Sequence, residues 1–198
     1  MTTIAVLGNG RVGGTLARAL TGAGHEVTAA GRSPGAAVDA VRGARVVVNA
    51  TPGAGSLERL AALREELRGK VLLDVSNATV DGPDGLPAGL LHPGSSLAER
   101  LHEALPGTGV VKSLDTMLFP VMTAPASPAQ APTVFLSGED PEAKQVVREL
   151  LGDLGWQPGW ITDLGGIETA RATEAAVLFV PHVIRVGGFT PFAVSITR

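Results

Sequence analysis

The sequence predicts an α/β fold built on a doubly wound parallel sheet, and three observations support this. Short apolar runs rich in β-branched residues alternate with stretches of helical periodicity along most of the 198 residues. The first run, Ile4-Ala5-Val6-Leu7, leads into Gly8-Asn9-Gly10-Arg11-Val12-Gly13 and then into an amphipathic segment. The composition is 44% hydrophobic, which suits a chain of this length with a sizeable core.

Each glycine in the turn after the first strand has its own structural role. Gly8 permits the tight turn, Gly10 lets the backbone approach a pyrophosphate, and Gly13 lets the helix pack closely on the strand. The helix that follows, expected to end at Gly22-Ala23-Gly24, directs its N-terminal amides at the anion. The glycine motif alone is weak evidence, because a chain with 26 glycines often matches it by chance. The prediction of a dinucleotide site therefore depends on the strand and the helix that flank the motif. The alternative is an ordinary strand-to-helix turn.

The second strand, which begins at Glu26, indicates which dinucleotide binds. An NAD site commonly has Asp or Glu at the end of this strand, where it binds the ribose 2'-hydroxyl. Gly31, Arg32 and Ser33 stand there instead and supply a guanidinium and a hydroxyl for a 2'-phosphate. We therefore predict NADP(H) as the cofactor. The alternative is that Arg32 is a solvated cation and that Ser33 caps a helix that starts at Pro34. The two interpretations are compatible with each other.

Further strands and helices continue the alternation. We expect strands over residues 45–50, 71–75, 109–113 and 133–136, and helices over 36–41, 56–67, 96–105 and 140–151. The helix over 56–67 should turn its leucines inward and its charged residues outward, namely Glu58, Arg59, Arg64, Glu65 and Glu66. Residues 77–95 and 118–132 read as long loops, either binding loops or surface excursions.

Ligands of open α/β sheets bind outside the carboxyl ends of the strands. We therefore expect the cofactor to contact the glycine turn and the loops that follow three later strands. The predicted contacts are Gly8, Asn9, Gly10, Arg11, Val12, Gly13, Gly31, Arg32, Ser33, Ala50, Thr51, Pro52, Asn77 and Ser113. For the polar residues the alternative is that they only form turns and caps. Residues 117–122 would form an apolar shelf for a planar acceptor, or else pack in the core or against another subunit.

Charge and composition disfavour several partners and sites. The net charge is −3 with both signs interspersed, so we expect no nucleic acid and no anionic membrane as a partner. The absence of cysteine excludes disulfides and thiolate metal sites, and the four histidines lack metal-ligand spacing, so we predict no metal. The chain shows neither a basic leader nor an apolar run of roughly 18 residues, so we expect a cytoplasmic protein.

Four segments beyond the glycine turn resemble the NADPH-dependent F420 reductase family and its small relatives. Residues 69–77 read G-K-V-L-L-D-V-S-N and resemble the family's G-K-x-V-x-D-x-[ST]-N. Residues 110–116 read V-V-K-S-L-D-T and resemble V-V-K-A-F-N-T, and residues 138–144 read G-E-D-P-E-A-K and resemble G-D-D-x-E-A-K. Asp163-Leu164-Gly165, Ala170-Arg171 and Glu174 resemble a D-x-G-x-L-x-x-A-R-x-x-E stretch, so the likeness extends nearly end to end.

The resemblance implies a Rossmann domain, residues 1–163, and a short C-terminal part, residues 164–198, that partly covers its cleft. The residue pattern of this part predicts a helix through Arg171 and Glu174 and a strand over residues 192–196. The resemblance also implies hydride transfer between NADPH and the deazaflavin F420 or a flavin-like acceptor. The sequence departs from the family at Asp115, where Asn is common and where an ionised carboxylate would repel an anionic acceptor. It also has Ala78 in place of Pro and a bulkier stretch over 117–120. The tail would direct Arg171 or Arg185 at an anionic acceptor, or would form the contact of a homodimer.

Hydride transfer requires alignment of donor and acceptor carbons more than acid or base groups from the protein. We therefore predict no catalytic dyad, and name Thr116 or solvent as a source of the proton that a deazaflavin also takes up. Two other functions stay open at this point. One is a non-catalytic NADP(H) sensor. The other is a reductase of a small imine or carbonyl compound, which would need a positioned proton donor that the sequence does not reveal.

Overall fold

The computed structural model describes residues 1–31 and 33–196, and a seven-stranded sheet lies at its centre. The spatial order is β2-β1-β3-β4-β7-β8-β9, so the chain reverses its direction of travel across the sheet between β1 and β3. The strands are β1 (Thr3–Leu7), β2 (Glu26–Ala30), β3 (Val46–Asn49), β4 (Val71–Asp74), β7 (Gly109–Lys112), β8 (Val134–Ser137) and β9 (Ile161–Gly165). The doubly wound α/β fold is confirmed.

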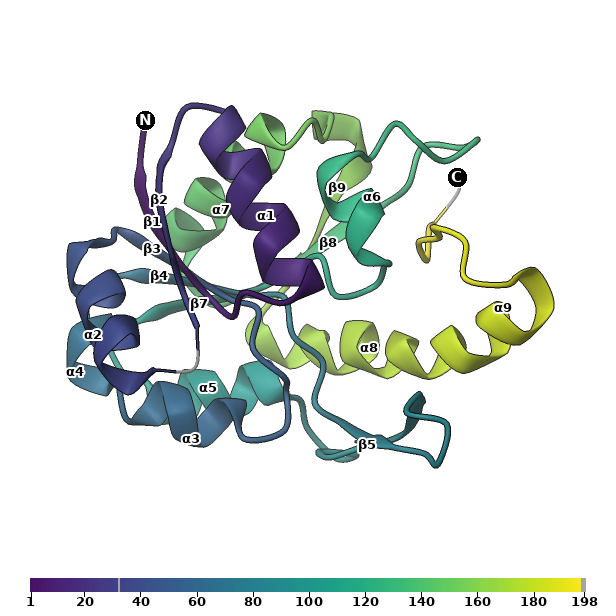
Figure 1. Ribbon diagram of the computed structural model, residues 1–198, viewed down its shortest axis with the longest axis horizontal. Helices are drawn as coiled ribbons and strands as arrows, with labels where there is room; N and C mark the ends of the chain where they lie inside the picture. The colour runs from purple at the N-terminus through teal and green to yellow at the C-terminus, as the bar shows by residue number, and fades with distance from the viewer. Residues whose placement is uncertain (32, 197–198) are drawn as a thin grey trace.

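Helices cover both faces of this sheet (Figure 1). Ile4 and Val6 of β1 pack toward α1 (Arg11–Gly22), α6 (Phe119–Thr123) and α7 (Pro141–Asp153). Ala5 and Leu7 pack on the other face, toward α2 (Pro34–Gly43), α3 (Ser56–Ala61), α4 (Arg64–Leu67) and α5 (Leu97–Ala104). Successive strand residues point to opposite faces, which explains why nearly continuous apolar runs encode strands buried on both sides.

One strand runs against the expected direction. β8 pairs with β7 in the antiparallel sense, and β9 then pairs parallel to β8. The connection between β7 and β8 contains the short helix α6 and re-enters the sheet at the same end at which β7 leaves it. An antiparallel pair can be joined in this way without a crossover. The prediction of a wholly parallel sheet is therefore wrong for this pair, and β9 was not predicted at all.

Three other predicted segments differ in detail. The helix over 56–67 is two short helices, α3 and α4, joined at residues 62–63. The loop over 77–95 contains a two-stranded hairpin, β5 (Thr79–Asp81) and β6 (Pro87–Leu90). The loop over 118–132 contains α6, which starts directly after Leu118 with Pro120 in its first turn.

The segment over 166–196, called the C-terminal cover here, packs across the carboxyl end of the sheet. It consists of η2 (Ile167–Thr169), α8 (Ala170–Ala175), η3 (Ala176–Phe179), α9 (Val180–Gly187) and a tail. The tail lies antiparallel to the loop after β7, since Leu118 N donates to Phe192 O (3.0 Å) and Val194 N to Thr116 O (2.9 Å). The strand predicted over 192–196 is reduced to this one isolated bridge.

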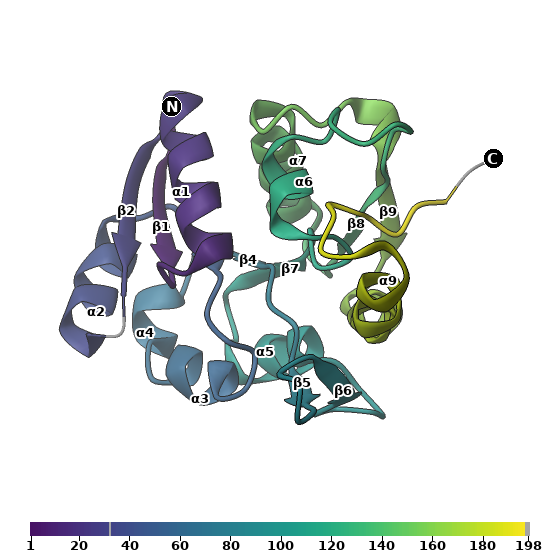
Figure 2. The same cartoon turned by 45° about the vertical axis from the view of Figure 1, so that its right-hand side comes forward.

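The two halves of the molecule meet at the central strands. Figure 2 shows β1, β2 and α2 on one side of β4 and β7, and β8, β9 and α9 on the other. The predicted boundary between residues 163 and 164 falls within β9, and the division into two domains stays a prediction. Within residues 1–31 and 33–196, every helix is too short or too polar to cross a lipid bilayer.

Candidate functional site

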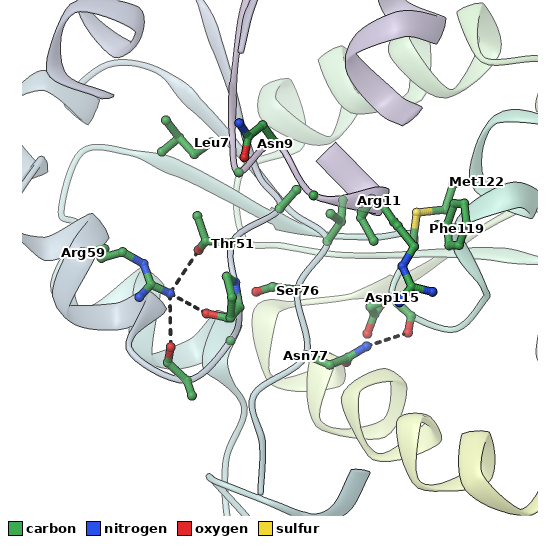
Figure 3. A pocket seen from close by; sticks show the side chains of 18 of the residues that line it. Leu7, Asn9, Arg11, Thr51, Arg59, Ser76, Asn77, Asp115, Phe119 and Met122 are labelled. Carbon is green, nitrogen blue, oxygen red and sulfur yellow. Dashed lines mark hydrogen bonds between the residues drawn. The ribbon is translucent and has the colours of Figure 1, made fainter. Parts of the chain in front are cut away.

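A cavity of about 1230 Å³ lies at the carboxyl ends of the central strands. Its walls come from the glycine turn after β1, the loops after β3, β4 and β7, and the C-terminal cover (Figure 3). This is the position at which open α/β sheets bind ligands. Most of the predicted site residues line it, namely Gly8, Asn9, Gly10, Arg11, Val12, Gly31, Ser33, Ala50, Thr51, Pro52, Asn77 and Thr116.

The glycine turn has the geometry that its sequence predicts. Gly8 has a φ of +99°, and a Cβ added there would lie 2.5 Å from the Ala50 carbonyl oxygen. A Cβ on Gly13 would lie 1.8 Å from the Gly8 carbonyl oxygen, so Gly13 serves the packing of α1 on β1 and does not line the cavity. Gly10, the N-cap of α1, has nothing within 4 Å of its missing Cβ. An anion can therefore approach the first amides of α1 at Gly10.

The end of β2 contributes Gly31 and Ser33 to the cavity wall. Arg32, the residue predicted to hold a 2'-phosphate, lies outside the described residues. Ser33 is the N-cap of α2 by position, but its side chain makes no capping hydrogen bond. Among the described lining residues, Asp115 is the one carboxylate, and it comes from the loop after β7 at a different part of the cavity. The β2 side of the cavity is therefore electrostatically open to a phosphate.

Arg59 is exposed, as the sequence predicted, and it also lines the cavity. Its Nη2 donates to the carbonyl oxygens of Pro52 (2.5 Å) and Ala54 (3.1 Å), and it lies 3.4 Å from the Thr51 hydroxyl. These contacts fix the loop after β3 against α3 (Figure 3). The helical pattern of 56–67 gives no signal for this role, because the loop that Arg59 binds precedes the helix.

A buried polar network also holds the loop after β3 in place. Asn49 Nδ2 donates to Ser56 Oγ and to Asp74 Oδ1, each at 2.7 Å, and Asn49 Oδ1 accepts from the Thr51 hydroxyl at 2.7 Å. Asn49, Ser56 and Asp74 are all fully buried. Since each of these groups has a partner, the network positions the Thr51 loop relative to β4.

Lys112, at the end of β7, is buried in a second network. Its Nζ lies 2.8 Å from Asp74 Oδ2 and 3.1 Å from Glu174 Oε1, and it also donates to the Ser76 carbonyl. Burial favours the neutral amine, but the attraction of Asp74 and Glu174 outweighs it and raises the pKa of Lys112 above its ordinary value. Lys112 therefore stays charged and acts as a structural cation rather than as an acid.

Asp115 lies beside this cluster and lines the cavity. Only 4% of the residue is exposed, and its carbonyl accepts a hydrogen bond from Asn77 Nδ2 (2.9 Å). Burial raises the pKa of Asp115 to about 6, although the charge of Lys112 acts in the opposite direction. Within the described part of the chain, Oδ2 of Asp115 and Oδ1 of Asn77 are buried and have no hydrogen-bond partner. The sequence indicated Asp115 only as a departure from the family pattern.

The remaining predicted residues divide between the cavity and the core. Ser113 does not line the cavity, because it is fully buried and its hydroxyl donates to the Phe135 carbonyl (2.8 Å). The apolar shelf does line it, through Met117, Leu118, Phe119 and Met122. The C-terminal cover adds further apolar side chains to the cavity wall, namely Ala176, Val177, Val180, Phe192 and Val194.

The arginines of the cover have partners of their own. Arg171 forms a bidentate pair with Glu99, with Nη2–Oε1 at 2.6 Å and Nε–Oε2 at 2.9 Å. The hydrogen bonds from Arg171 lower the pKa of Glu99 to about 2. Arg185 lies 3.4 Å from Asp84. Neither arginine is among the residues that line the cavity, and the expectation that one of them faces an anionic acceptor stays a prediction.

Comparisons with known proteins agree with this geometry. A family model described as NADP oxidoreductase, coenzyme F420-dependent, matches residues 3–78. A solved structure from Arthrobacter sp. FB24, described as a candidate F420-dependent NADP-reductase, is 36% identical with a TM-score of 0.91, and each chain is covered completely.

Two curated proteins are similar over smaller shares of their length. The F420-dependent NADP reductase of Methanocaldococcus jannaschii is 28% identical over 69% of this chain and 60% of its own. The metalloreductase STEAP3 of Rattus norvegicus is 27% identical over 96% of this chain and 40% of its own. The chain thus spans less than two thirds of either curated relative.

Proposed function

Because the chain belongs to the family of coenzyme F420-dependent NADP oxidoreductases, we propose that it transfers a hydride between NADP(H) and the deazaflavin F420 or a flavin-like acceptor. One observation carries the proposal: a single cavity connects the glycine turn to the apolar shelf. Its volume of about 1230 Å³ exceeds the roughly 300–1,000 Å³ typical of pockets for one small ligand. The cavity has room for a dinucleotide and for a second planar ring.

NADP(H) fits one part of this cavity by the chemistry of its walls. Gly10 and the first amides of α1 would hold the pyrophosphate, and Gly31, Arg32 and Ser33 would surround the 2'-phosphate. The scarcity of carboxylates among the described lining residues favours a ligand with this many negative charges. Thr51 and Asn77, at the ends of β3 and β4, would then contact the nicotinamide riboside.

A planar acceptor fits the opposite part. Phe119 and Met122 supply apolar surface from one side, and Val177 and Val180 of the cover supply it from the other. The bound nicotinamide supplies the hydride, so the protein has to align the two rings and exclude water between them. An apolar shelf and an apolar cover, held together by the Leu118 to Phe192 and Val194 to Thr116 hydrogen bonds, serve both needs.

The test follows the absorbance of NADPH with F420, FMN and FAD offered separately to the purified protein. Consumption of NADPH with F420 alone supports the proposal, and consumption with FMN or FAD reassigns the acceptor. Binding of NADPH without oxidation by any acceptor supports a nucleotide sensor instead. Calorimetry that detects no binding of NADP or NADPH refutes the cofactor assignment.

We also propose that the protein is a cytoplasmic homodimer. Phe179, Val186 and Phe189 expose large apolar side chains on α9 and beside it, and Val186 is 92% exposed. Such side chains are typical of subunit contacts. Light scattering should give a dimer for the wild type and a monomer for Val186→Asp. A monomeric wild type refutes the dimer.

A further inference from the structure

Asp115 is the one carboxyl group among the described residues that line the cavity. Figure 3 shows it with Asn77 on the same side of the cavity as Phe119 and Met122, and Thr51 on the other side with Arg59. Asp115 is therefore on the side where the proposed function places the acceptor.

The carboxyl group of Asp115 has an unused hydrogen-bonding position. Asp115 is 96% buried, yet among residues 1–31 and 33–196 its Oδ2 has no hydrogen-bond partner, and the neighbouring Asn77 Oδ1 has none either. Asn77 Nδ2 holds the Asp115 main chain through its carbonyl at 2.9 Å. A buried carboxylate oxygen without a donor is unfavourable, whereas a protonated carboxyl can serve as a donor to a ligand group. A bound ligand could therefore supply the hydrogen-bond partner that the Asp115 carboxyl group lacks among the described residues.

The groups packed around Asp115 favour its neutral form. Lys112 of β7 attracts it, but this ammonium is already bound by Asp74 of β4 and Glu174 of α8. The Thr173 hydroxyl of α8 stabilises the carboxylate, and the Glu174 carboxylate opposes it. Ionised Asp115 would be the third carboxylate near one cation, and only 4% of the residue is exposed. The pKa of about 6 that results from burial lies near neutrality, as general acid catalysis requires.

We propose that the Asp115 carboxyl group is the proton donor of this hydride transfer, an inference that rests on the proposed function. Asp115 gives its proton to the acceptor nitrogen that gains electron density when the hydride of NADPH bonds to an acceptor carbon. The O–H bond of Asp115 breaks as the N–H bond forms, NADPH is oxidised to NADP⁺, and the acceptor is reduced. Solvent then returns a proton to the carboxylate. In the reverse direction the Asp115 carboxylate removes the same proton.

The test compares the wild type with Asp115→Asn, which keeps the shape of the side chain and cannot release a proton. Turnover with F420 is measured in both directions from about pH 5 to about pH 9, and the wild-type rate is divided by the variant rate at each pH, so that ionisation of the acceptor cancels. In the direction of acceptor reduction the ratio should be roughly 10²–10⁴ at low pH and fall as the pH rises past about 6. In the reverse direction the ratio should rise with pH.

Two controls separate this role from a structural one. The affinity for NADPH, measured by fluorescence titration, should be the same in Asp115→Asn and the wild type. Asp84→Asn, which alters a half-exposed carboxylate that pairs with Arg185, should keep wild-type rates and pH dependence. A ratio near one at every pH overturns the proposal even when the wild type reduces F420.

Infrared spectroscopy tests the donor without any acceptor. The difference between wild type and Asp115→Asn, both saturated with NADP⁺, should show the carbonyl stretch of a protonated carboxylic acid that disappears as the pH rises past about 6. Absence of this band at acidic pH overturns the proposal. Presence of the band in a protein that does not oxidise NADPH with F420 refutes the proposed acceptor and still supports Asp115 as an available proton donor.

Discussion

Lys112→Met should be among the most destabilising single substitutions in this chain. Lys112, Asp74 and Glu174 are 1%, 0% and 4% exposed, and the Lys112 ammonium lies 2.8 Å and 3.1 Å from the two carboxylates. Methionine is similar in size to lysine, so the effect is mainly electrostatic: two carboxylates lose a shared cation in a medium of low dielectric. Breaking a buried pair in this way costs about 3–5 kcal/mol, which in a domain of this size lowers Tm by roughly 6–20 °C.

Urea unfolding monitored by the fluorescence of the buried Trp156 measures this loss. Lys144→Met is the matched control, because Lys144 pairs with Asp163 at 3.0 Å nearer the surface and should cost less than about 1 kcal/mol. Adding Glu174→Gln to Lys112→Met should recover part of the loss, since it removes one of the two uncompensated charges. A loss from Lys112→Met no larger than that from Lys144→Met would refute the reasoning.

Three further predictions concern the cavity and the residues around it. Gly13→Ala places a Cβ 1.8 Å from the Gly8 carbonyl oxygen, so it should lower the free energy of unfolding by about 1–3 kcal/mol and weaken NADPH binding. The control is Gly14→Ala, whose Cβ would lie 3.6 Å from its nearest neighbour and should stabilise α1 by about 0.5–1 kcal/mol. Equal shifts in the melting temperatures of the two variants would contradict this prediction. Ser33→Asp places a carboxylate beside the predicted 2'-phosphate, so calorimetry should find NADPH weakened at least roughly tenfold and NADH little changed. Because burial raises the pKa of Asp115 from 3.8 to about 6, the stability contributed by its neutral form is present below about pH 4 and is lost as the pH rises through 6. Asp115→Asn should therefore stabilise the protein by up to about 3 kcal/mol at pH 8 and have no such effect near pH 4. A gain in stability that does not depend on pH would contradict this prediction.

Much of the cavity wall around the glycine turn could be predicted from the sequence, because short motifs and strand ends mark it. The spacing of Gly8, Gly10 and Gly13 is a short sequence signal, although the Ala50 carbonyl of the loop after β3 also leaves no room for a side chain at Gly8. The end of β2 could likewise be recognised from the alternation of strand and helix. The loops after β3 and β4 supplied Thr51 and Asn77 for the same reason, since the ends of parallel strands meet at one edge of the sheet.

The buried polar groups in the other part of the cavity could not be predicted, because their environment depends on residues far apart in the chain. A lysine in the middle of V-V-K-S gives no sign that it will be buried between carboxylates of β4 and α8. Ser113 was expected at the cavity because it ends a strand, but its hydroxyl donates to the Phe135 carbonyl of β8, the neighbouring strand, whose antiparallel direction was not predicted. Only the tertiary packing of these elements shows that Asp115 is buried, lacks a partner for one oxygen and lines the cavity.

The network around Glu174 connects the position of the C-terminal cover to the protonation of Asp115. Glu174 of α8 accepts hydrogen bonds from Leu97 N (2.9 Å) and Ala98 N (3.1 Å) at the start of α5 and also pairs with Lys112. Its charge raises the pKa of Asp115, while it engages the cation that would lower it. Glu174→Gln should therefore lower the pKa of Asp115, and the pH at which Asp115-dependent turnover falls should move to a more acidic value. The comparison is between Glu174→Gln with and without Asp115→Asn, and an unchanged midpoint would show that the cover and the proton donor are electrostatically independent.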